Sequence, residues 1–365
     1  MNKWKIALIP GETVGPELIR EADRLLDTVG RVYHIPMERI HLCAGGAAID
    51  RWNDPLPAAV RARAASCDAI LFGSIGAAKY NALPPEKNPA RALLELRSVF
   101  GVTTNLRPVR LRPEQIDLSP LKPEIIPGGF DILLVRDVRG GMLAAREQRH
   151  AVGKCGQSAS DLEYYDERIV MHTARRAFEA ASQRTGRLIS LDKANVLASS
   201  VLWRQTVTRL AAEYPKVALE HRFIDTAAMD VIRAPQDFDV ILTGNVFGDI
   251  LADELAQLSG IAPQLGSAEL APDGRGLYTL NQLHYPGENL AGQGKVCPLG
   301  ILAATAMLLR YTCHRPDAAQ AVEQAIDTVI SAHLATPDIC RKGDTILSTE
   351  ELGCAVCQCI RSEKE

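Results

Sequence analysis

The sequence predicts an α/β protein with a largely parallel sheet. Short apolar runs that end in Gly, Asp or Ser recur along the chain, and helical patterns separate several of them. Strands that alternate with helices favour this fold class, and the ends of such strands are where loops gather ligands. Hydrophobic residues make up 47% and charged residues 23% of the chain, which is typical of a globular protein.

Each expected element has a local pattern behind it. The strands are apolar runs that stop at a turn residue: WKIALIPG (4–11), DAILFGS (68–74), DILLVRD (131–137), LISLDKA (188–194) and DVILTGN (239–245). The helices show apolar residues at helical spacing: PELIREADRLLDTV (16–29), DERIVMHTARRAFEAAS (166–182), SVLWRQTVTRLAAEY (200–214) and the apolar LGILAATAMLLRY (299–311). We find no internal repeat.

Length, charge and cysteine usage limit the function classes. The 365 residues are enough for two domains, and the net charge of -3 argues against nucleic acid or an anionic membrane as a partner. No signal peptide and no run of about 18 apolar residues is seen. The nine scattered cysteines fit reduced thiols and a cytoplasmic location. We interpret the C-x-x-C of Cys354 and Cys357 as helix packing, because no second ligand pair has zinc spacing.

The stretch TGNVFGDILADEL (243–255) places Asp249 and Asp253 four residues apart in an apolar segment. Two carboxylates on one helix face need a lysine or arginine, a solvated surface, or a divalent metal between them. Because oxygen ligands suit Mg²⁺ or Mn²⁺, a metal site is one interpretation, and Asp225 in FIDTAAMDVI is a third candidate ligand. A solvated helix face is the other interpretation.

Arginines and a possible proton shuttle form two further sets. If Arg97, Arg107 and Arg136 converge, their forks suit a substrate with two or more carboxylates, although each alone also fits an ordinary surface residue. Lys193 follows an expected strand, and a lysine or tyrosine beside a divalent cation can transfer protons. Tyr164 and Tyr165 are the candidate tyrosines, and packing with a solvated hydroxyl is the alternative for both.

Two glycine-rich loops follow expected strands, GETVGPE (11–17) and GSIGAAK (73–79). Neither has the spacing G-x-G-x-x-G, so both fail as Rossmann dinucleotide motifs. As turns they still allow a ligand to approach the backbone closely, with Gly76 as the candidate position.

These sets, in this order, resemble the β-decarboxylating 2-hydroxyacid dehydrogenases, the isocitrate and isopropylmalate dehydrogenase family, and its isopropylmalate branch above all. The resemblance runs from IPGETVGPE through LLELR, TNLRPVR, DKANVL and TGNVFGDILADE to AGQGKVCP and so covers nearly the whole chain. It implies a two-domain α/β fold that is not a Rossmann fold. Residues 1–102 and 260–365 would form a discontinuous cofactor-side domain, and 103–259 a central domain with the dimer interface. Homodimers, or dimers of dimers, would share active sites.

The resemblance also assigns roles. Asp249 and Asp253, with Asp225 from the partner, would hold Mg²⁺ or Mn²⁺, and Lys193 from the partner would be the base on the C2 hydroxyl. Tyr165, rather than Tyr164, would protonate the enol carbon. The substrate carboxylates would be bound by three arginines, Arg97, Arg107 and Arg136. The implied reaction is oxidative decarboxylation with hydride transfer to NAD.

The substrate side chain is less strictly implied. Leu93 and Leu94 stand where isopropylmalate enzymes present an apolar wall, which favours 3-isopropylmalate, although two leucines at helical spacing also fit a core. Arg91 beside them is the feature that favours a more polar substrate. The alternatives are tartrate, D-malate, isocitrate, homoisocitrate or another alkyl- or aryl-malate, and, from another class, a catalytically silent regulatory subunit.

Departures from the family pattern cluster on the cofactor side. Glu12 and Thr13 are unusual in the start motif, and Ala90 stands where isopropylmalate enzymes commonly carry a glutamate. With His284 on the family histidine, Asn289 replaces the aspartate that receives the adenosine ribose, and Cys297 replaces an asparagine near the adenine. An asparagine loses the repulsion of a 2′-phosphate, so NAD is expected on family grounds and NADP stays open.

Overall fold

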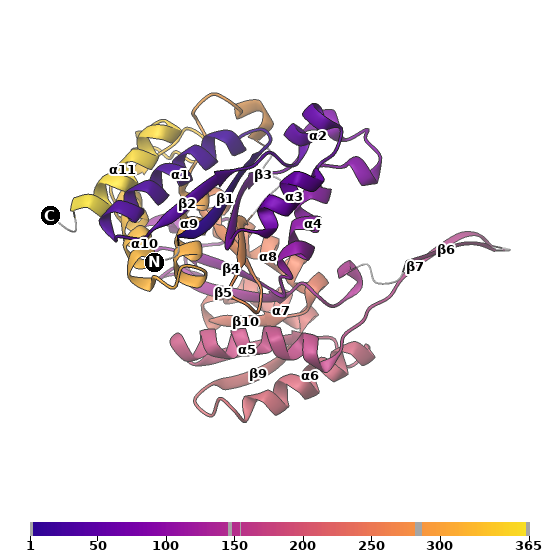
Figure 1. Cartoon of the computed structure of the whole chain (residues 1–365). Helices are drawn as coiled ribbons and strands as arrows, with labels where there is room; N and C mark the ends of the chain where they lie inside the picture. Colours follow the sequence, from indigo (N-terminus) through magenta and orange to yellow (C-terminus); the bar gives the residue numbers. More distant parts are fainter. Residues whose placement is uncertain (1–2, 145–147, 154, 282–286, 363–365) are drawn as a thin grey trace. The chain divides into compact units, whose positions relative to one another are not determined.

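The structure is a computed structural model that describes residues 3–144, 148–153, 155–281 and 287–362. The chain divides into two compact units. Unit 1 contains Met1–Val102 and Ile261–Glu365, and unit 2 contains Thr103–Gly260. In Figure 1 the indigo helix α1 (Gly15–Val32) lies beside the yellow helix α11 (Thr349–Ser362), and Arg24 Nη2 of α1 donates to Glu350 Oε1 of α11 at 2.6 Å. The two ends of the chain therefore build unit 1 together.

Unit 1 has a mostly parallel sheet with helices packed against it. In spatial order its strands are β2 (Met37–His41), β1 (Trp4–Gly11), β3 (Ala69–Ser74), β12 (Gly276–Leu280) and β11 (Gly266–Leu270). All neighbours pair in parallel except β12 and β11, which are antiparallel. Every residue of β3 is buried, as expected for a parallel strand covered on both faces.

The helices of unit 1 come from both chain ends. Besides α1 and α11 they are α2 (Gly46–Trp52), α3 (Ala58–Ala65), α4 (Ala90–Phe100), α9 (Leu299–Tyr311) and α10 (Pro316–Ser331). Helix α9 is buried over most of its length, as its apolar sequence predicts. A short parallel bridge joins β13 (Leu334–Ala335) to β14 (Thr345–Ile346).

Unit 2 repeats this architecture with its own core. In spatial order its strands are β4 (Thr104–Leu111), β5 (Phe130–Asp137), β10 (Val240–Thr243), β8 (Arg187–Asp192) and β9 (Ala218–Phe223). β4 and β5 are antiparallel, and the other neighbours are parallel. Its helices are α5 (Glu167–Gln183), α6 (Ala198–Ala211), α7 (Ile224–Arg233) and α8 (Asn245–Ser259).

A separate hairpin belongs to unit 2. It pairs β6 (Gln148–Gly153) with β7 (Gly156–Asp161), and every residue of β7 is exposed. Figure 1 shows this hairpin projecting away from helices α5 and α6. Among the described helices, none combines the length and the apolar character needed to cross a membrane.

The predicted α/β class is confirmed, and the mixed strand directions refine it. Because β5, β10 and β8 are parallel neighbours, their carboxyl ends lie along one edge of the unit 2 sheet. Arg136, Lys193 and the start of α8 all lie at or just after those ends. This edge is where ligands gather in open α/β sheets, and candidate residues from distant parts of the sequence meet there.

Candidate active site

Asp249 and Asp253 lie one turn apart on α8, with side chains 47% and 60% exposed. Arg136 Nη1 from β5 donates to Asp249 Oδ1. Arg107 Nη1 from β4 donates to Asp253 Oδ1 at 3.1 Å, and its Nη2 lies 3.9 Å from Asp249 Oδ1. Two guanidinium groups and partial solvation therefore offset the like charges on this helix face.

The pairing of β4 with β5 brings the two arginines to this face. Asn105 lies opposite Arg136 in the register, and its Oδ1 accepts from Arg107 Nε at 2.9 Å. Arg136 is buried, and the Arg107 side chain is mostly buried. A guanidinium held away from water needs an acceptor for each donor, so both forks are preorganised to bind carboxylates.

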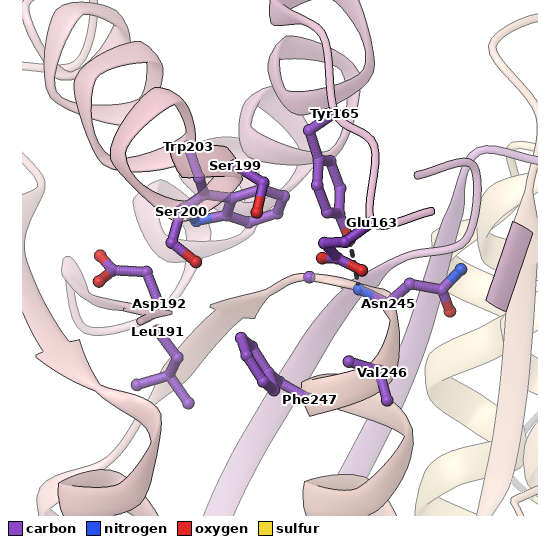
Figure 2. A pocket seen from close by; sticks show the side chains of 11 residues that line it. Glu163, Tyr165, Leu191, Asp192, Ser199, Ser200, Trp203, Asn245, Val246 and Phe247 are labelled. Atoms are coloured by element: carbon purple, nitrogen blue, oxygen red, sulfur yellow. Dashed lines mark hydrogen bonds between the residues drawn. The ribbon is translucent and has the colours of Figure 1, made fainter. Parts of the chain in front are cut away.

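Tyr165 lies in a pocket beside the start of α8 (Figure 2). Its hydroxyl accepts the backbone N–H of Asn245 at 2.7 Å, and its ring meets the Trp203 ring edge to face with centroids 5.5 Å apart. Burial raises the pKa of the Tyr165 hydroxyl, and the Asp137 carboxylate adds to this rise. At neutral pH the hydroxyl is therefore a protonated donor.

Lys193 and Asp225 form an ion pair in the same unit. Lys193 follows β8, Asp225 lies in the first turn of α7, and Lys193 Nζ donates to Asp225 Oδ1 at 2.6 Å. This hydrogen bond lowers the pKa of Asp225. Both groups are partly exposed, so solvent and ligands reach them.

The three candidate metal ligands do not form one cluster within the single chain. In the part of the chain that the structure describes, no three His, Cys, Asp or Glu side chains are grouped to hold a metal ion. Asp249 and Asp253 supply two hard oxygen donors at i,i+4 spacing on an exposed helix face. These two donors fit part of a Mg²⁺ or Mn²⁺ site that needs further ligands.

The remaining substrate candidates lie on α4 of unit 1. Arg97 Nε donates to the buried Glu269 of β11 at 2.7 Å, and Arg97 Nη2 completes the fork on the same carboxylate. Leu93 is only 6% exposed and packs in the core, whereas Leu94 is 49% exposed. Of the two leucines, Leu94 alone offers a surface to a ligand.

The family model described as isocitrate/isopropylmalate dehydrogenase matches residues 5–356, nearly the whole chain. The chain belongs to the isocitrate/isopropylmalate dehydrogenase family. It is therefore an oxidatively decarboxylating dehydrogenase.

Several members of the isocitrate/isopropylmalate dehydrogenase family show the extent of the likeness. The protein named 3-isopropylmalate dehydrogenase from Syntrophotalea carbinolica is 43% identical over 97% of this chain and 98% of its own, and that from Bordetella avium is 41% identical over 98% and 99%. A β-decarboxylating dehydrogenase from Thermococcus kodakarensis has a TM-score of 0.78, 26% identity and coverage of 98% and 96%. An isocitrate dehydrogenase from Methylococcus capsulatus, at 24% identity and 98% and 99% coverage, shares the fold with a TM-score of 0.83.

Glu12, one of the departures from the family pattern, joins two loops of unit 1. Glu12 is buried, and its Oε2 accepts the Gly76 N–H at 2.7 Å while its Oε1 accepts the Gly46 N–H. Burial raises the pKa of Glu12, although the N–H donors oppose the rise. The Gly76 N–H is therefore committed to a side chain of the same unit.

The other predicted cofactor residues have different surroundings. Asn289 is exposed, and its backbone oxygen accepts from Gln293 Nε2 at 2.6 Å. Cys297 is buried, burial raises the pKa of its thiol, and its N–H donates to Asp338 Oδ2 at 2.9 Å. The thiol of Cys297 is therefore enclosed by protein atoms. His284 lies outside the described residues.

Sequence reasoning missed two residues that organise these groups. Asn245 contacts both Tyr165 and Arg136, and Glu269 pairs with Arg97. A glutamate within the otherwise uncharged strand GSAEL (Gly266–Leu270) is the signal for Glu269, since a buried carboxylate needs a partner. Asn245 gave a weaker signal, because asparagine at the start of a helix usually indicates only a cap.

Proposed function

We propose that the protein catalyses the Mg²⁺- or Mn²⁺-dependent oxidative decarboxylation of a substituted malate, with 3-isopropylmalate as the first substrate to test and NAD as the acceptor. The observation that carries this proposal is that Arg107 and Arg136 pair with Asp249 and Asp253 on one face of α8. The names of the relatives support the substrate class.

The metal would be held by Asp249 and Asp253, together with the partner subunit's Asp225. When bound, the metal would supply a Lewis acid for the C2 oxygen of the substrate, and NAD would supply the hydride acceptor. Asp249 pairs with Arg136 and Asp253 with Arg107, so a cation on the carboxylates would compete with these two guanidinium groups. Donors of Arg107 and Arg136 that leave the aspartates would be available to the substrate carboxylates.

The protons would be moved by two residues. The partner subunit's Lys193 takes the proton of the C2 hydroxyl, so that the C2 oxygen carries the charge needed for hydride departure. After CO₂ leaves, Tyr165 donates its hydroxyl proton to C3 of the enolate. Burial keeps that hydroxyl protonated, which suits a donor. We further propose that the protein is a homodimer in the cytoplasm and that its two subunits share their active sites.

The substrate side chain would meet Leu94, the exposed leucine of α4. Arg91, in the same helix, pairs with Glu95 at 3.7 Å, so its charge is already partly compensated within α4. This arrangement favours an alkyl-substituted malate over a third carboxylate.

The test is nucleotide reduction at 340 nm with Mg²⁺ across substituted malates, tartrate, isocitrate and homoisocitrate, each with NAD and NADP. We expect 3-isopropylmalate with NAD to give the highest kcat/KM. A faster rate with NADP would follow from Asn289, which does not repel a 2′-phosphate. No turnover in protein that still binds a malate by calorimetry would overturn the proposal and favour a regulatory subunit.

A further inference from the structure

Asn245, the first residue of α8, links the candidate proton donor to the candidate substrate arginine. Its backbone N–H donates to Tyr165 Oη at 2.7 Å. Its side-chain Oδ1 accepts from Arg136 Nη2 at 2.8 Å, and its backbone oxygen accepts from Arg136 Nε at 2.9 Å. The side-chain Nδ2 donates to Gly140 O at 2.8 Å. Buried and with these hydrogen bonds made, Asn245 has a fixed orientation.

The contact with Tyr165 determines which way the phenol proton points. The N–H of Asn245 belongs to the unpaired donors at a helix start, and no side chain caps α8. It occupies an acceptor position on the Tyr165 oxygen, so the hydroxyl must direct its own proton elsewhere. Among the described residues, no acceptor takes that proton. The proton is therefore available to a ligand.

Close neighbours on several sides hold the ring of Tyr165 at this contact. A Cβ on Gly140 would overlap the ring, and a Cβ on Gly244 would lie 2.8 Å from the hydroxyl oxygen. On another side, the Trp203 ring packs against the Tyr165 ring in an edge-to-face arrangement. Figure 2 shows the hydroxyl of Tyr165 directed at the backbone of Asn245. Close packing of this kind holds a donor within a few tenths of an ångström.

We propose that Asn245 is a positioning residue that aligns two groups at once: its backbone N–H directs the Tyr165 proton to C3 of the substrate, and its side chain aims Arg136 at a substrate carboxylate. This inference rests on the proposed function. In the proton step, the Tyr165 O–H bond breaks, a C3–H bond forms, the enolate becomes the ketone of the 2-oxo acid, and solvent returns a proton to the phenolate.

Two substitutions separate the two roles. Asn245→Ala keeps the N–H and the backbone oxygen that accepts from Arg136 Nε, and it loses the side-chain contacts with Arg136 and with Gly140 O. Asn245→Pro also removes the N–H and puts a ring carbon in its place, while proline is well tolerated at the first position of a helix. Gly244 precedes it with φ -68° and ψ 175°, a conformation that suits the residue before proline.

We expect Asn245→Ala to raise KM about tenfold with a smaller change in kcat, because a misaimed arginine weakens carboxylate binding. Asn245→Pro should lower kcat by a further factor of about 100, the usual size of a general-acid contribution. With 3-isopropylmalate in D₂O, the wild-type protein and Asn245→Ala should place deuterium at one of the two C3 positions. Asn245→Pro should place deuterium at both, because solvent then supplies the proton.

The Tyr165→Phe background is the control. There the difference in kcat between Asn245→Ala and Asn245→Pro should disappear, since the hydroxyl that the N–H contacts is gone. A difference that persists, or a proline variant with a wild-type kcat and stereochemistry, would overturn the proposal. If the proline variant does not fold, Gly244→Ala tests the same contact by pressing a methyl group against the hydroxyl; unaltered stereochemistry in that variant would also overturn it.

A measurement without substrate separates this inference from the proposed function. In a Trp4→Phe, Trp52→Phe background, Trp203 is the remaining tryptophan and reports on the Tyr165 ring beside it. Asn245→Pro should change the Trp203 emission and its quenching by acrylamide, whereas Asn245→Ala should not. A protein that reduces no nucleotide would refute the proposed function, but the effect of the Asn245 N–H on Tyr165 could still be measured in it by Trp203 emission. Identical emission in the two Asn245 variants would refute the positioning of Tyr165 by this N–H.

Discussion

Thr13 occupies a backbone conformation that suits its side chain poorly. Its φ is +50°, in the left-handed region where a β-branched residue is strained. It lies in the turn between β1 and α1, and its Oγ1 is 3.1 Å from Ser74 Oγ on the neighbouring strand. The hydrogen bond offsets part of the strain, so this position is a source of instability in unit 1.

We predict that Thr13→Asn raises the free energy of unfolding by about 1 kcal/mol, because asparagine accepts a left-handed φ more readily. Thr13→Val, which keeps the branch and loses the hydroxyl, should lower it by about 1 kcal/mol. Urea unfolding of the three proteins measures both changes. Equal values for the Asn and Val variants would show that the conformation of Thr13 carries no strain.

At the residue scale, the sequence predicts which side chains share one helix face better than it predicts which distant side chains pair with them. Helical spacing alone places Asp249 and Asp253 on one face, because that relation is local. The arginine that pairs with Asp249 is Arg136, 113 residues earlier in the chain, and no local pattern encodes such a contact. For the same reason the sequence shows Glu12 only as a departure from the family pattern, whereas its contacts with Gly46 and Gly76 are visible only in the structure.

At the scale of elements, the packing of α1 against α11 encloses a carboxyl group. Glu21 is 2% exposed, and Arg24 Nη1 lies 3.2 Å from its Oε2. Burial raises the pKa of Glu21 to about 7, the Arg24 charge opposes the rise, and Glu350 of α11 adds to it. The folded protein therefore holds a proton on Glu21 at pH values where the unfolded chain has lost it.

This difference predicts a pH-dependent stability. Between about pH 4.5 and 7 the folded state binds more protons, so stability falls as pH rises through that window. Glu21→Gln should match the wild-type protein near pH 4.5 and exceed it by on the order of 2 kcal/mol at pH 8. Urea unfolding at several pH values measures the difference. Glu351→Gln, on the exposed side of α11, is the control, and an equal gain from it would contradict the role of burial.

The strands that the sequence predicts well are those in the middle of each sheet. β1, β3, β5, β8 and β10 are buried apolar runs, which periodicity identifies. β9 reads ALEHRF and lies at the end of its sheet, so its outward residues are polar and no apolar run marks it. β7 is GQSASD, with every residue exposed, and only its pairing with β6 makes it a strand.

At the scale of the whole molecule, the proposed homodimer makes a strict prediction. Lys193 and Asp225 would serve the partner's site, while Asp249 and Asp253 serve their own. Co-expressed Lys193→Ala and Asp249→Asn chains, each inactive alone, should therefore form hybrid dimers with one intact site. If chains mix randomly, the mixture should recover about one quarter of wild-type activity.

The matched control pairs Asp249→Asn with Asp253→Asn. Both changes damage the site of their own chain, so every hybrid dimer has two damaged sites and no activity should return. Recovery in this control, or none with the Lys193→Ala pair, would contradict sharing. Separate affinity tags on the two chains isolate the hybrids for direct assay.

The division of unit 1 between the chain ends has a consequence for protein synthesis. β3 pairs with β12, and in this pairing Ala69 lies opposite Gly276. The two strands cannot pair until Gly276 has emerged from the ribosome, which happens after all of unit 2 has emerged. At the usual rates of translation, about 200 residues take on the order of 10 to 40 s. During that time unit 2 has its complete sequence and can fold, while β3 has an unpaired edge of the kind that aggregates. Nascent chains of this protein are therefore most prone to misassembly in the interval after β3 has emerged from the ribosome and before β12 has emerged.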